Sequence, residues 1–470
     1  MHFSSDPDRL LPVDPRTREI ARTLYESVAE LPIISPHGHV DPRMLLDDEP
    51  FPDPTELLLR YDHYVTRLLH ASGVALNDLG IPDRTGAAPT ADPRSVWRRF
   101  CERWHLFAGT ASGYWLRHEF TELFGLTEQP DADNADRLYD QISAVLARPG
   151  FRPRALFDEF RIEFLATTDD PLDDLSVHDA IAADATFTGR VAPTFRPDAY
   201  LNPANPGFLQ SVERLADWSG RAVDDYTGYL DDLAARRRHF VEHGAVSADH
   251  GVLQPLTVDL DAHDAAGLYA RAVRGELDET EAAVFQGHML LESARMSVDD
   301  GLVMTVHPGV YRNHSTATFE TFGPDTGHDL PIRTDYVQSL RPLLQRYGNI
   351  PDFHLVLFSV DETSFAREIA PLAGFYQSLY IGAPWWFLDA PDAVLRFRAA
   401  VTETAGFYRS SGFIDDTRAF LSIPARHDMA RRLDSAFLAR LVAEGRIDEP
   451  MAQKIAVDLV DVLPRTVFKL

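Results

Sequence analysis

Residues 31–39 read LPIISPHGH, and this stretch sets the fold and the chemistry that we expect of the chain. A short apolar run closed by polar residues is typical of a buried β-strand. Side chains two apart on a strand point to the same face, so His37 and His39 can present two imidazoles to one point. Imidazole nitrogen suits a divalent cation such as zinc or manganese, which predicts a metal site at the end of this strand, with a purely structural pair as the alternative.

Further runs repeat this pattern, each closed by polar residues and followed by a longer helical segment. They lie at 162–168, 191–195, 245–247, 302–306, 354–360, 379–381 and 413–414. Eight strands that alternate with helices predict an α/β fold, a (β/α)8 TIM-like barrel whose chemistry gathers at the carboxyl ends of the strands. Residues 14–30 have helical spacing with Asp14 as the cap, which predicts an N-terminal helix before the first strand.

The long segment between the first two predicted strands has a helical pattern. It is rich in aromatic residues and is broken by a Pro-, Gly- and Asp-rich stretch at 80–94. We interpret it as a helical insertion. The chain then divides into residues 1–54 with the N-terminal helix and the first barrel strand, the insertion at 55–150, and the remainder of the barrel with C-terminal helices at 151–470.

The composition limits the classes of partner. The formal net charge is -27, from 72 acidic and 45 basic residues. Nucleic acid and anionic membrane both require a basic surface, so neither is an expected partner. Cys101 is the only cysteine, which excludes an internal disulfide and a cysteine-rich zinc site. Without a signal-peptide pattern or a long apolar run, we expect a soluble cytoplasmic protein.

The end of the last predicted strand supplies a third candidate ligand. In a closed barrel the eighth strand lies beside the first, so Asp416 should approach His37 and His39 and complete a metal site with open positions. Arg418, two residues further on, should face the same way. Asp415 is the rival ligand, but it should point to the opposite face. A surface ion pair or a turn cap is the alternative for Asp416 and Arg418.

The order of motifs resembles that of the uronate isomerases over nearly the whole chain. The matching stretches are HGH at 37–39, YDHY at 61–64, TTDDP at 167–171, TFRPD at 194–198, SADHG at 247–251, HPGVYRN at 307–313, APWWF at 383–387, DDTRAFLS at 415–422 and ARHDMARR at 425–432. The resemblance implies an amidohydrolase-type barrel and one divalent metal ion, zinc with manganese as the alternative. It also implies interconversion of D-glucuronate with D-fructuronate and of D-galacturonate with D-tagaturonate.

The resemblance also implies roles for individual residues. The metal ligands would be His37, His39 and Asp416, and Asp416, Tyr64 and Arg418 would be catalytic. The residues that would bind substrate are Arg196, Asp249, His307, Arg312 and Trp385. Whether His307 or His250 also contacts the metal stays open.

Each of these roles has a structural alternative. Tyr64 could be a half-buried tyrosine of a helix start, Arg196 and Arg312 could form stabilising ion pairs, and the two tryptophans of APWWF could be packing or pocket wall. His427 could cap a helix. Ser35 and His314 depart from the family pattern, which leaves the surroundings of the ligands and the substrate preference open.

Two other function classes compete. A metal-dependent hydrolase can use the same barrel, although the fourth strand offers Asp249 and His250 without a lysine to bridge two metals. A non-catalytic sugar-acid binding protein would leave Tyr64, Asp416 and Arg418 unexplained. We expect a small hexuronate as the partner and a homo-oligomer as the assembly, while the choice between glucuronate and galacturonate is open.

Overall fold

Seven parallel strands form the centre of the molecule in two sheets. The structure is a computed structural model that describes residues 3, 5–85 and 91–470. One sheet has the order β1-β2-β3 and the other has the order β4-β5-β8-β9. The strands are β1 Ile33–Ser35, β2 Ile162–Ala166, β3 Arg190–Ala192, β4 Ser247–Val252, β5 Val303–Pro308, β8 Leu355–Leu357 and β9 Leu379–Ile381. The chain therefore has an α/β fold with parallel sheets.

Each of these strands overlaps one of the predicted runs; the bounds agree for β9 and differ for the others. The fourth strand continues through the polar residues that were expected to end it, because Asp249 and His250 are buried and hydrogen-bonded within the sheet. Residues 413–414 form no strand, which corrects that prediction. Gly412 has φ 78° and Asp416 has φ 41°, both outside the extended conformation that a strand requires.

Backbone hydrogen bonds outside the regular strands connect the edges of the two sheets. Beyond β3, Phe195 donates to Ser247 and accepts from Asp249, which joins β3 to β4. At the other edge, the amide of Ser411 donates to the carbonyl of β9 residue Ile381. The amide of His39, just after β1, donates to the carbonyl of Thr417. Residues 410–417 thus lie between β9 and β1, the place predicted for the eighth strand.

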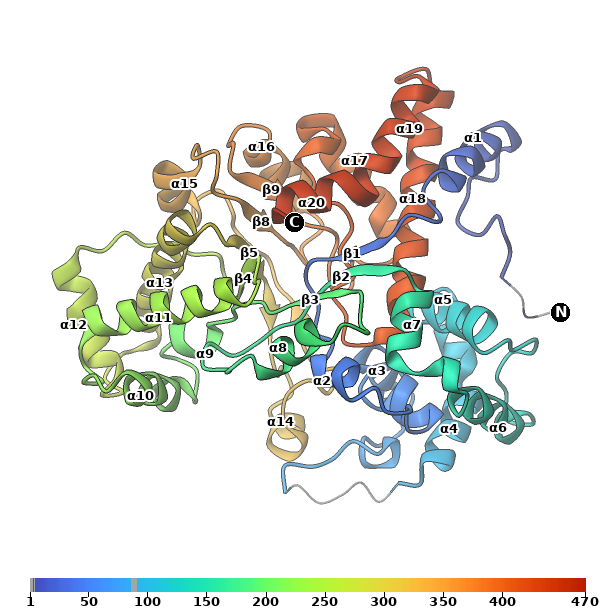
Figure 1. Cartoon of the computed structure of the whole chain (residues 1–470), viewed down its shortest axis with the longest axis horizontal. Coiled ribbons are helices and arrows are strands. Elements are labelled where there is room, and N and C mark those ends of the chain that lie inside the picture. Colours follow the sequence, from blue (N-terminus) through green and yellow to red (C-terminus); the bar gives the residue numbers. More distant parts are fainter. Residues whose placement is uncertain (1–2, 4, 86–90) are drawn as a thin grey trace.

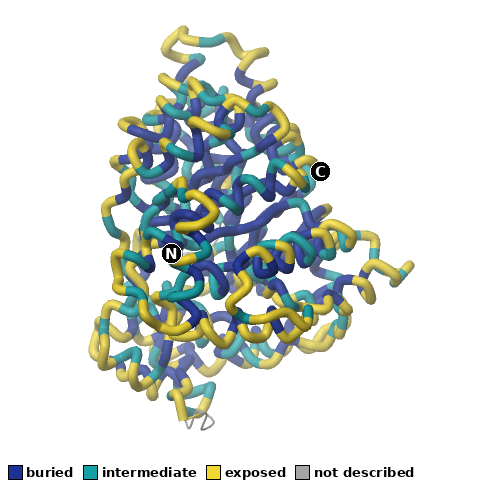
Figure 2. Tube along the Cα trace, turned by 90° about the vertical axis from the view of Figure 1, so that its left-hand side faces the viewer, coloured by how far each residue is buried: buried dark blue, intermediate teal, exposed yellow. Residues whose placement is uncertain are grey.

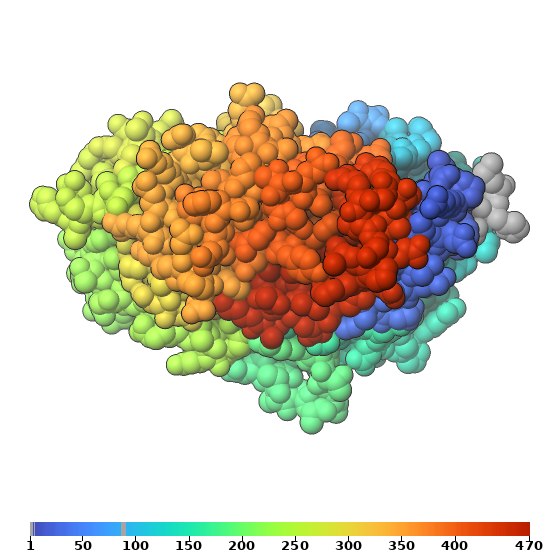
Figure 3. All heavy atoms as spheres, turned by 90° about the horizontal axis from the view of Figure 1, so that it is seen from above, coloured from blue at the N-terminus to red at the C-terminus, as the bar shows by residue number. Residues whose placement is uncertain are grey.

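The N-terminal helix forms as predicted. Helix α1 spans Pro15–Glu26, and the side chain of Asp14 caps it by accepting from the amide of Thr17. It packs against the C-terminal helix α18, Ile423–Ala443. Figure 3 shows this contact as the blue N-terminal segment beside the red C-terminal segment.

Helices surround the strands in Figure 1. Between β1 and β2 the described residues contain helices and no strand: α2 Pro42–Asp47, α3 His63–Ala71, α4 Pro93–Glu102, α5 Ala111–His118, α6 Ala135–Leu146 and α7 Pro153–Glu159. Buried aromatic side chains of this region, among them Trp97, Phe100 and Phe120, share one core cluster with Ile33 and Ile162 of the first two strands. This helical region and the first sheet are therefore packed together.

The remaining helices follow the later strands. They are α8 Ser176–Ala183, α9 Asp198–Leu201, α10 Phe208–Ser219, α11 Tyr226–Glu242, α12 Ala262–Ala272, α13 Glu279–Asp300, α14 Thr316–Phe322, α15 Arg341–Tyr347, α16 Ala370–Ala373, α17 Pro391–Ala405, α19 Glu449–Val457 and α20 Leu463–Phe468. Short 3-10 or π-helical segments lie at Glu56–Arg60, Asn77–Leu79, Trp104–Phe107, Glu119–Leu123, Pro149–Phe151, Phe365–Ile369, Phe407–Arg409, Phe420–Ser422 and Asp458–Val462.

The strands β6 Val310–Tyr311 and β7 Leu330–Pro331 form a small antiparallel pair, and α14 lies between them in the sequence. Figure 2 shows buried residues concentrated in the interior of the molecule and exposed residues mostly along its outside. Among the described residues, no helix combines the length and the apolar content needed to cross a bilayer.

Candidate active site

Two histidines and an aspartate meet where the chain leaves β1. The Nε2 atoms of His37 and His39 lie 3.4 and 3.1 Å from the same Oδ1 atom of Asp416. The His37 side chain is buried and that of Asp416 is 7% exposed, whereas the side chain of His39 is 28% exposed. The left-handed backbone of Asp416 is uncommon for a residue other than glycine, and such conformations cluster at functional sites.

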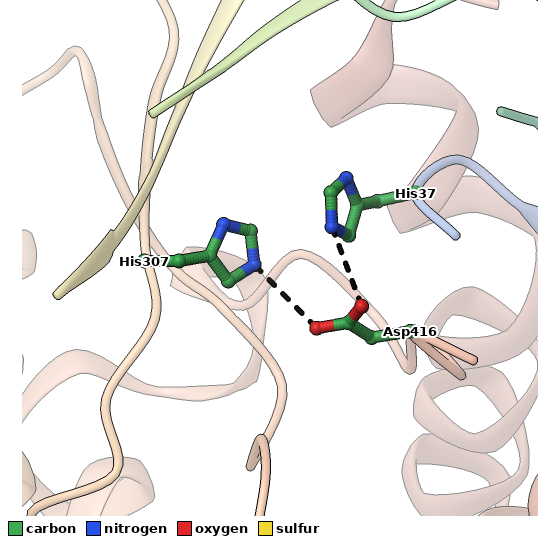
Figure 4. Close-up of side chains that lie close together, drawn as sticks. All are labelled: His37, His307 and Asp416. Carbon is green, nitrogen blue, oxygen red and sulfur yellow. Dashed lines mark ion pairs between the residues drawn. The ribbon is translucent and has the colours of Figure 1, made fainter. Parts of the chain in front are cut away.

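A third imidazole reaches the same carboxylate from β5. His307 Nε2 lies 3.8 Å from Asp416 Oδ2, and Figure 4 shows the rings of His37 and His307 pointing at the two oxygens of this carboxylate. His307 also stacks on His37, with ring centroids 4.6 Å apart, and on Phe358, with centroids 4.0 Å apart. His307 therefore belongs to the cluster.

This cluster has the donor chemistry of a cation site. Ligand atoms of His37, His307 and Asp416 all lie within 4.8 Å of one another. His307 Nε2 and Asp416 Oδ2 are buried and have no hydrogen-bond partner among the described residues. Burying unpaired polar atoms is costly, and a divalent cation would satisfy them. Burial opposes ionisation of Asp416, but His37 and His39 outweigh it and hold the pKa of the carboxyl well below its usual range. The residues fit a single divalent cation.

Asp249 of β4 contacts the cluster through Nδ1 of His307. Its Oδ1 lies 2.6 Å from His307 Nδ1 and accepts a hydrogen bond of 2.7 Å from the hydroxyl of Thr305. Its Oδ2 faces Arg196 Nη1 at 3.5 Å. A carboxylate on the far nitrogen of an imidazole fixes the tautomer and the orientation of the ring. Asp249 therefore aims Nε2 of His307 at Asp416.

All ten predicted site residues line one cavity of about 1260 Å³. They are His37, His39, Tyr64, Arg196, Asp249, His307, Arg312, Trp385, Asp416 and Arg418. Trp385 forms a wall beside the cluster, with its ring edge-on to His307 at a centroid distance of 4.8 Å. The sequence segments that supply these residues lie far apart in the chain, so the fold is what gathers them.

The three arginines of this set are paired with carboxylates. Arg196 Nε lies 2.9 Å from Asp198 Oδ2 in addition to its contact with Asp249. Arg196 is largely buried between these partners.

The other two arginines share one partner. Asp325 lies 3.7 Å from Arg312 and 3.4 Å from Arg418, and Arg312 also contacts Asp329 at 3.1 Å. Both arginines are about half exposed toward the cavity side of the molecule. A guanidinium pair bridged by a protein carboxylate can also bind a carboxylate of a ligand.

Tyr64 lies at the start of α3, where Asp62 caps the helix. Its hydroxyl donates to the carboxylate of Asp389, with distances of 3.1 and 3.2 Å to the two oxygens, and accepts a 3.3 Å hydrogen bond from the amide of Phe387. Burial, and then the negative charge of Asp389, raise the pKa of Tyr64 well above its usual range. The phenol is therefore protonated at neutral pH.

Two of the neighbouring candidates point elsewhere. Asp415 Oδ2 lies 2.9 Å from His427 Nε2, so His427 of α18 is the partner of this buried aspartate. His250 Nδ1 lies 3.0 Å from the carbonyl of Thr305, and His250 is outside the group that could hold a metal. Among the described residues, His307 and not His250 joins the cluster.

Among the cavity-lining residues that the sequence reasoning missed are His63, Asp389 and Arg426. His63 is within the YDHY motif, next to Tyr64, and that proximity was the signal available for it. Asp389 follows the APWWF motif, and Arg426 lies within ARHDMARR, but no spacing rule connects these two segments to each other or to Tyr64.

An α/β fold of parallel strands, with a His/Asp cluster and a cavity that arginine and aspartate side chains help to line, defines the protein as an enzyme with a candidate site for one divalent cation. Residues 16–462 match the model of the family described as glucuronate isomerase. The chain belongs to the glucuronate isomerase family.

Individual relatives agree over the full length. A curated uronate isomerase from Corynebacterium efficiens is 52% identical over 468 residues, covering 99% of each chain. The crystal structure of glucuronate isomerase from Caulobacter crescentus has a TM-score of 0.97 and 48% identity, and the match covers 100% of this chain and 98% of that one. The uronate isomerase structure from Thermotoga maritima has a TM-score of 0.92 at 26% identity, over 98% of this chain and 99% of that one.

Proposed function

We propose that the chain is a uronate isomerase, which interconverts the aldose and ketose forms of hexuronates through an enediol. Its substrates would be D-glucuronate, giving D-fructuronate, and D-galacturonate, giving D-tagaturonate. The observation that carries the proposal is the convergence of His37, His39, His307 and Asp416 in a cavity lined by arginines, within a chain about half identical to curated uronate isomerases.

The architecture proposed for this activity is a (β/α)8 barrel of the amidohydrolase type. The isolated hydrogen bonds that join Phe195 beyond β3 to β4, Ser411 to β9 and His39 to Thr417 support it, because they lie where a closed barrel needs contacts between the edges of the two sheets. Residues 1–54 would supply the N-terminal helix and the first strand, residues 55–150 the helical insertion, and residues 151–470 the remainder. A cytoplasmic location and assembly into a homo-oligomer belong to the same proposal.

His37, His39 and Asp416 would hold one divalent metal ion, with His307 as a neighbour close enough to contact it. Nitrogen and carboxylate ligands favour zinc, with manganese as the alternative. When bound, such an ion supplies a positive charge that draws the anionic substrate and stabilises negative charge on its oxygens.

The chain's own residues would then divide the work of isomerisation. The reaction moves a proton from C2 to C1 and a second proton between two oxygens, which requires a base and a proton relay. Asp416 would take the C2 proton on its carboxylate. Tyr64 and Arg418 would hydrogen-bond the reacting oxygens, and Tyr64 would pass protons between them.

Arg196 and Arg312 would orient the substrate. Both are cations at the cavity in a protein whose overall charge is strongly negative. Bidentate contact with a carboxylate or with vicinal hydroxyls is the chemistry that guanidinium groups provide best. Trp385 would form the wall against which the sugar ring packs. Asp249 would help to bind substrate and would also hold Arg196 and His307 in place.

A metal-dependent hydrolase is the alternative that this site chemistry also allows, and family membership favours the isomerase. A coupled assay separates the two. Purified protein, loaded with zinc or manganese, is mixed with D-glucuronate or D-galacturonate, and formation of the ketouronate is followed with a ketouronate reductase. We expect turnover of at least one hexuronate and no release of acid from amides or lactones. Acid release without ketouronate would contradict the proposal.

The variant Asp416→Asn tests whether turnover in this assay depends on the site. It keeps the size of the side chain but removes the base, so we expect kcat to fall by about 10³-fold or more. The circular dichroism spectrum should be unchanged. If Asp416→Asn retained a tenth of the wild-type rate, Asp416 would not be the base.

A further inference from the structure

A turn after β9 holds the hydroxyl of Tyr64 from two sides. Within residues 385–389, the amide of Phe387 donates to this hydroxyl, and the carboxylate of Asp389 accepts its proton in a hydrogen bond. A hydroxyl has one proton and two lone pairs. Two of these three positions are occupied by the turn, which leaves one lone pair for a ligand in the cavity that Tyr64 lines.

The turn adopts an unfavourable backbone conformation to make these contacts. Trp386 has φ 23° and Phe387 has φ 67°, the left-handed region that costs a residue with a Cβ atom about 1–3 kcal/mol. Packing offsets the cost: Arg312 lies over the ring of Trp386 at 4.8 Å, and Arg67 lies over the ring of Phe387 at 4.7 Å. Conformations of this kind persist where function requires them.

A buried arginine anchors Asp389 in turn. Arg426 Nη1 lies 2.8 Å from Asp389 Oδ2, and both side chains are less than a tenth exposed. Arg426 Nε donates to the hydroxyl of Ser422 at 3.1 Å, and its guanidinium lies 3.6 Å from the centre of the ring of Trp115. The carboxylate on Tyr64 is therefore fixed in place and balanced by a cation.

We propose that Asp389, anchored by Arg426, is a positioning residue that orients the Tyr64 hydroxyl and holds its proton during isomerisation. The inference rests on the proposed function, in which Tyr64 meets the reacting oxygens. When a substrate hydroxyl gives its proton to Tyr64 Oη, the phenolic proton moves to Asp389. The reverse transfer returns that proton to Tyr64, which protonates the neighbouring substrate oxygen, so protons balance over one turnover.

The electrostatics of the pair agree with this geometry. Burial raises the pKa of Asp389 above its ordinary value, although Arg426 acts in the opposite direction. A carboxyl whose pKa is raised accepts a proton more readily than an exposed aspartate does.

A double-mutant cycle between Asp389→Asn and Tyr64→Phe tests the inference with the metal-loaded enzyme. Asparagine can still accept the hydrogen bond of Tyr64 but cannot take up a proton, so Asp389→Asn alone should lower kcat by about 10²-fold with KM changed less than about threefold. In the Tyr64→Phe background the same substitution should change kcat less than about threefold, because the hydroxyl through which Asp389 acts is absent.

The matched control is Asp434→Asn. Asp434 of α18 forms another buried ion pair, with Arg398 of α17, at distances of 2.6 and 2.7 Å. Neither of these residues lines the cavity. This control should lower stability as Asp389→Asn does but leave kcat within about twofold of wild type. The inference is overturned if Asp389→Asn retains wild-type kcat, if its effect persists undiminished in the Tyr64→Phe background, or if Asp434→Asn lowers kcat equally. Wild-type protein without hexuronate turnover would instead overturn the proposed function.

Discussion

Replacing Asp249 with asparagine should weaken metal binding without removing any ligand. In the structure the Asp249 carboxylate accepts from Thr305 and lies against His307 Nδ1, while its other oxygen faces Arg196. An asparagine that keeps its oxygen on His307 turns its NH2 group toward the Arg196 guanidinium. The opposite orientation puts an N–H on Nδ1, which forces the ring proton onto Nε2, the atom that faces Asp416.

Both orientations therefore work against a cation between His307 and Asp416. Loss of such a supporting carboxylate costs about 10–100-fold in metal affinity, or about 1.4–2.8 kcal/mol. Chelator competition, with zinc content measured after equilibrium dialysis, reads the affinity independently of activity. The control is Asp198→Asn, which removes another charge from Arg196 without touching His307 and should leave zinc affinity within about threefold. Zinc affinity of Asp249→Asn equal to that of wild type would refute the reasoning.

Two further substitutions test other contacts of the structure. Asp325→Asn frees Arg312 and Arg418 from their shared carboxylate, so KM for a hexuronate should fall about threefold in steady-state assays, and an unchanged or higher KM would contradict competition between Asp325 and the substrate. Asp428→Asn breaks a buried ion pair with Arg432 and should lower the free energy of unfolding by about 3 kcal/mol in urea titrations. Burial opposes ionisation of Asp428, but its arginine partners lower the pKa, so its contribution is complete above the pKa of an unfolded aspartate and is lost as pH falls through the folded value. The stability difference from wild type should therefore shrink below about pH 4, and a difference that grows there would exclude this origin.

Hydrophobic patterning predicted most of the strands because a buried parallel strand needs a continuous apolar run. Leu355–Leu357 and Leu379–Ile381 are such runs. The segment at 413–414 has the same pattern, yet it forms no strand, and the isolated backbone hydrogen bonds to β9 and to His39 are made by Ser411 and Thr417 on either side of it. The hydrophobic pattern of the sequence does not reveal the left-handed backbone of Asp416, because contacts with residues far away in the sequence determine it. The predicted place of this segment, beside the first strand, nevertheless agrees with the hydrogen bond between His39 and Thr417.

The spacing of residues in the sequence predicted contacts in the site only where two ligands follow the same strand. His37 and His39 are two residues apart, and both reach the carboxylate of Asp416. The contacts between Tyr64, Asp389 and Arg426 join the helical region, the loop after β9 and helix α18, so they depend on tertiary packing alone. Sequence periodicity describes one element at a time and therefore could not reveal this group.

The balance of charge around the cavity explains why a cation and an anionic substrate belong together here. Every cavity arginine of the predicted set already contacts a carboxylate, and the acidic groups outnumber the guanidinium groups: Asp198, Asp249, Asp325, Asp329 and Asp416 against Arg196, Arg312 and Arg418. Without a further positive charge the site would repel a hexuronate. Two charges from a divalent ion would lower the negative charge at the cluster, so the same ligands that hold the ion would also favour an anion there.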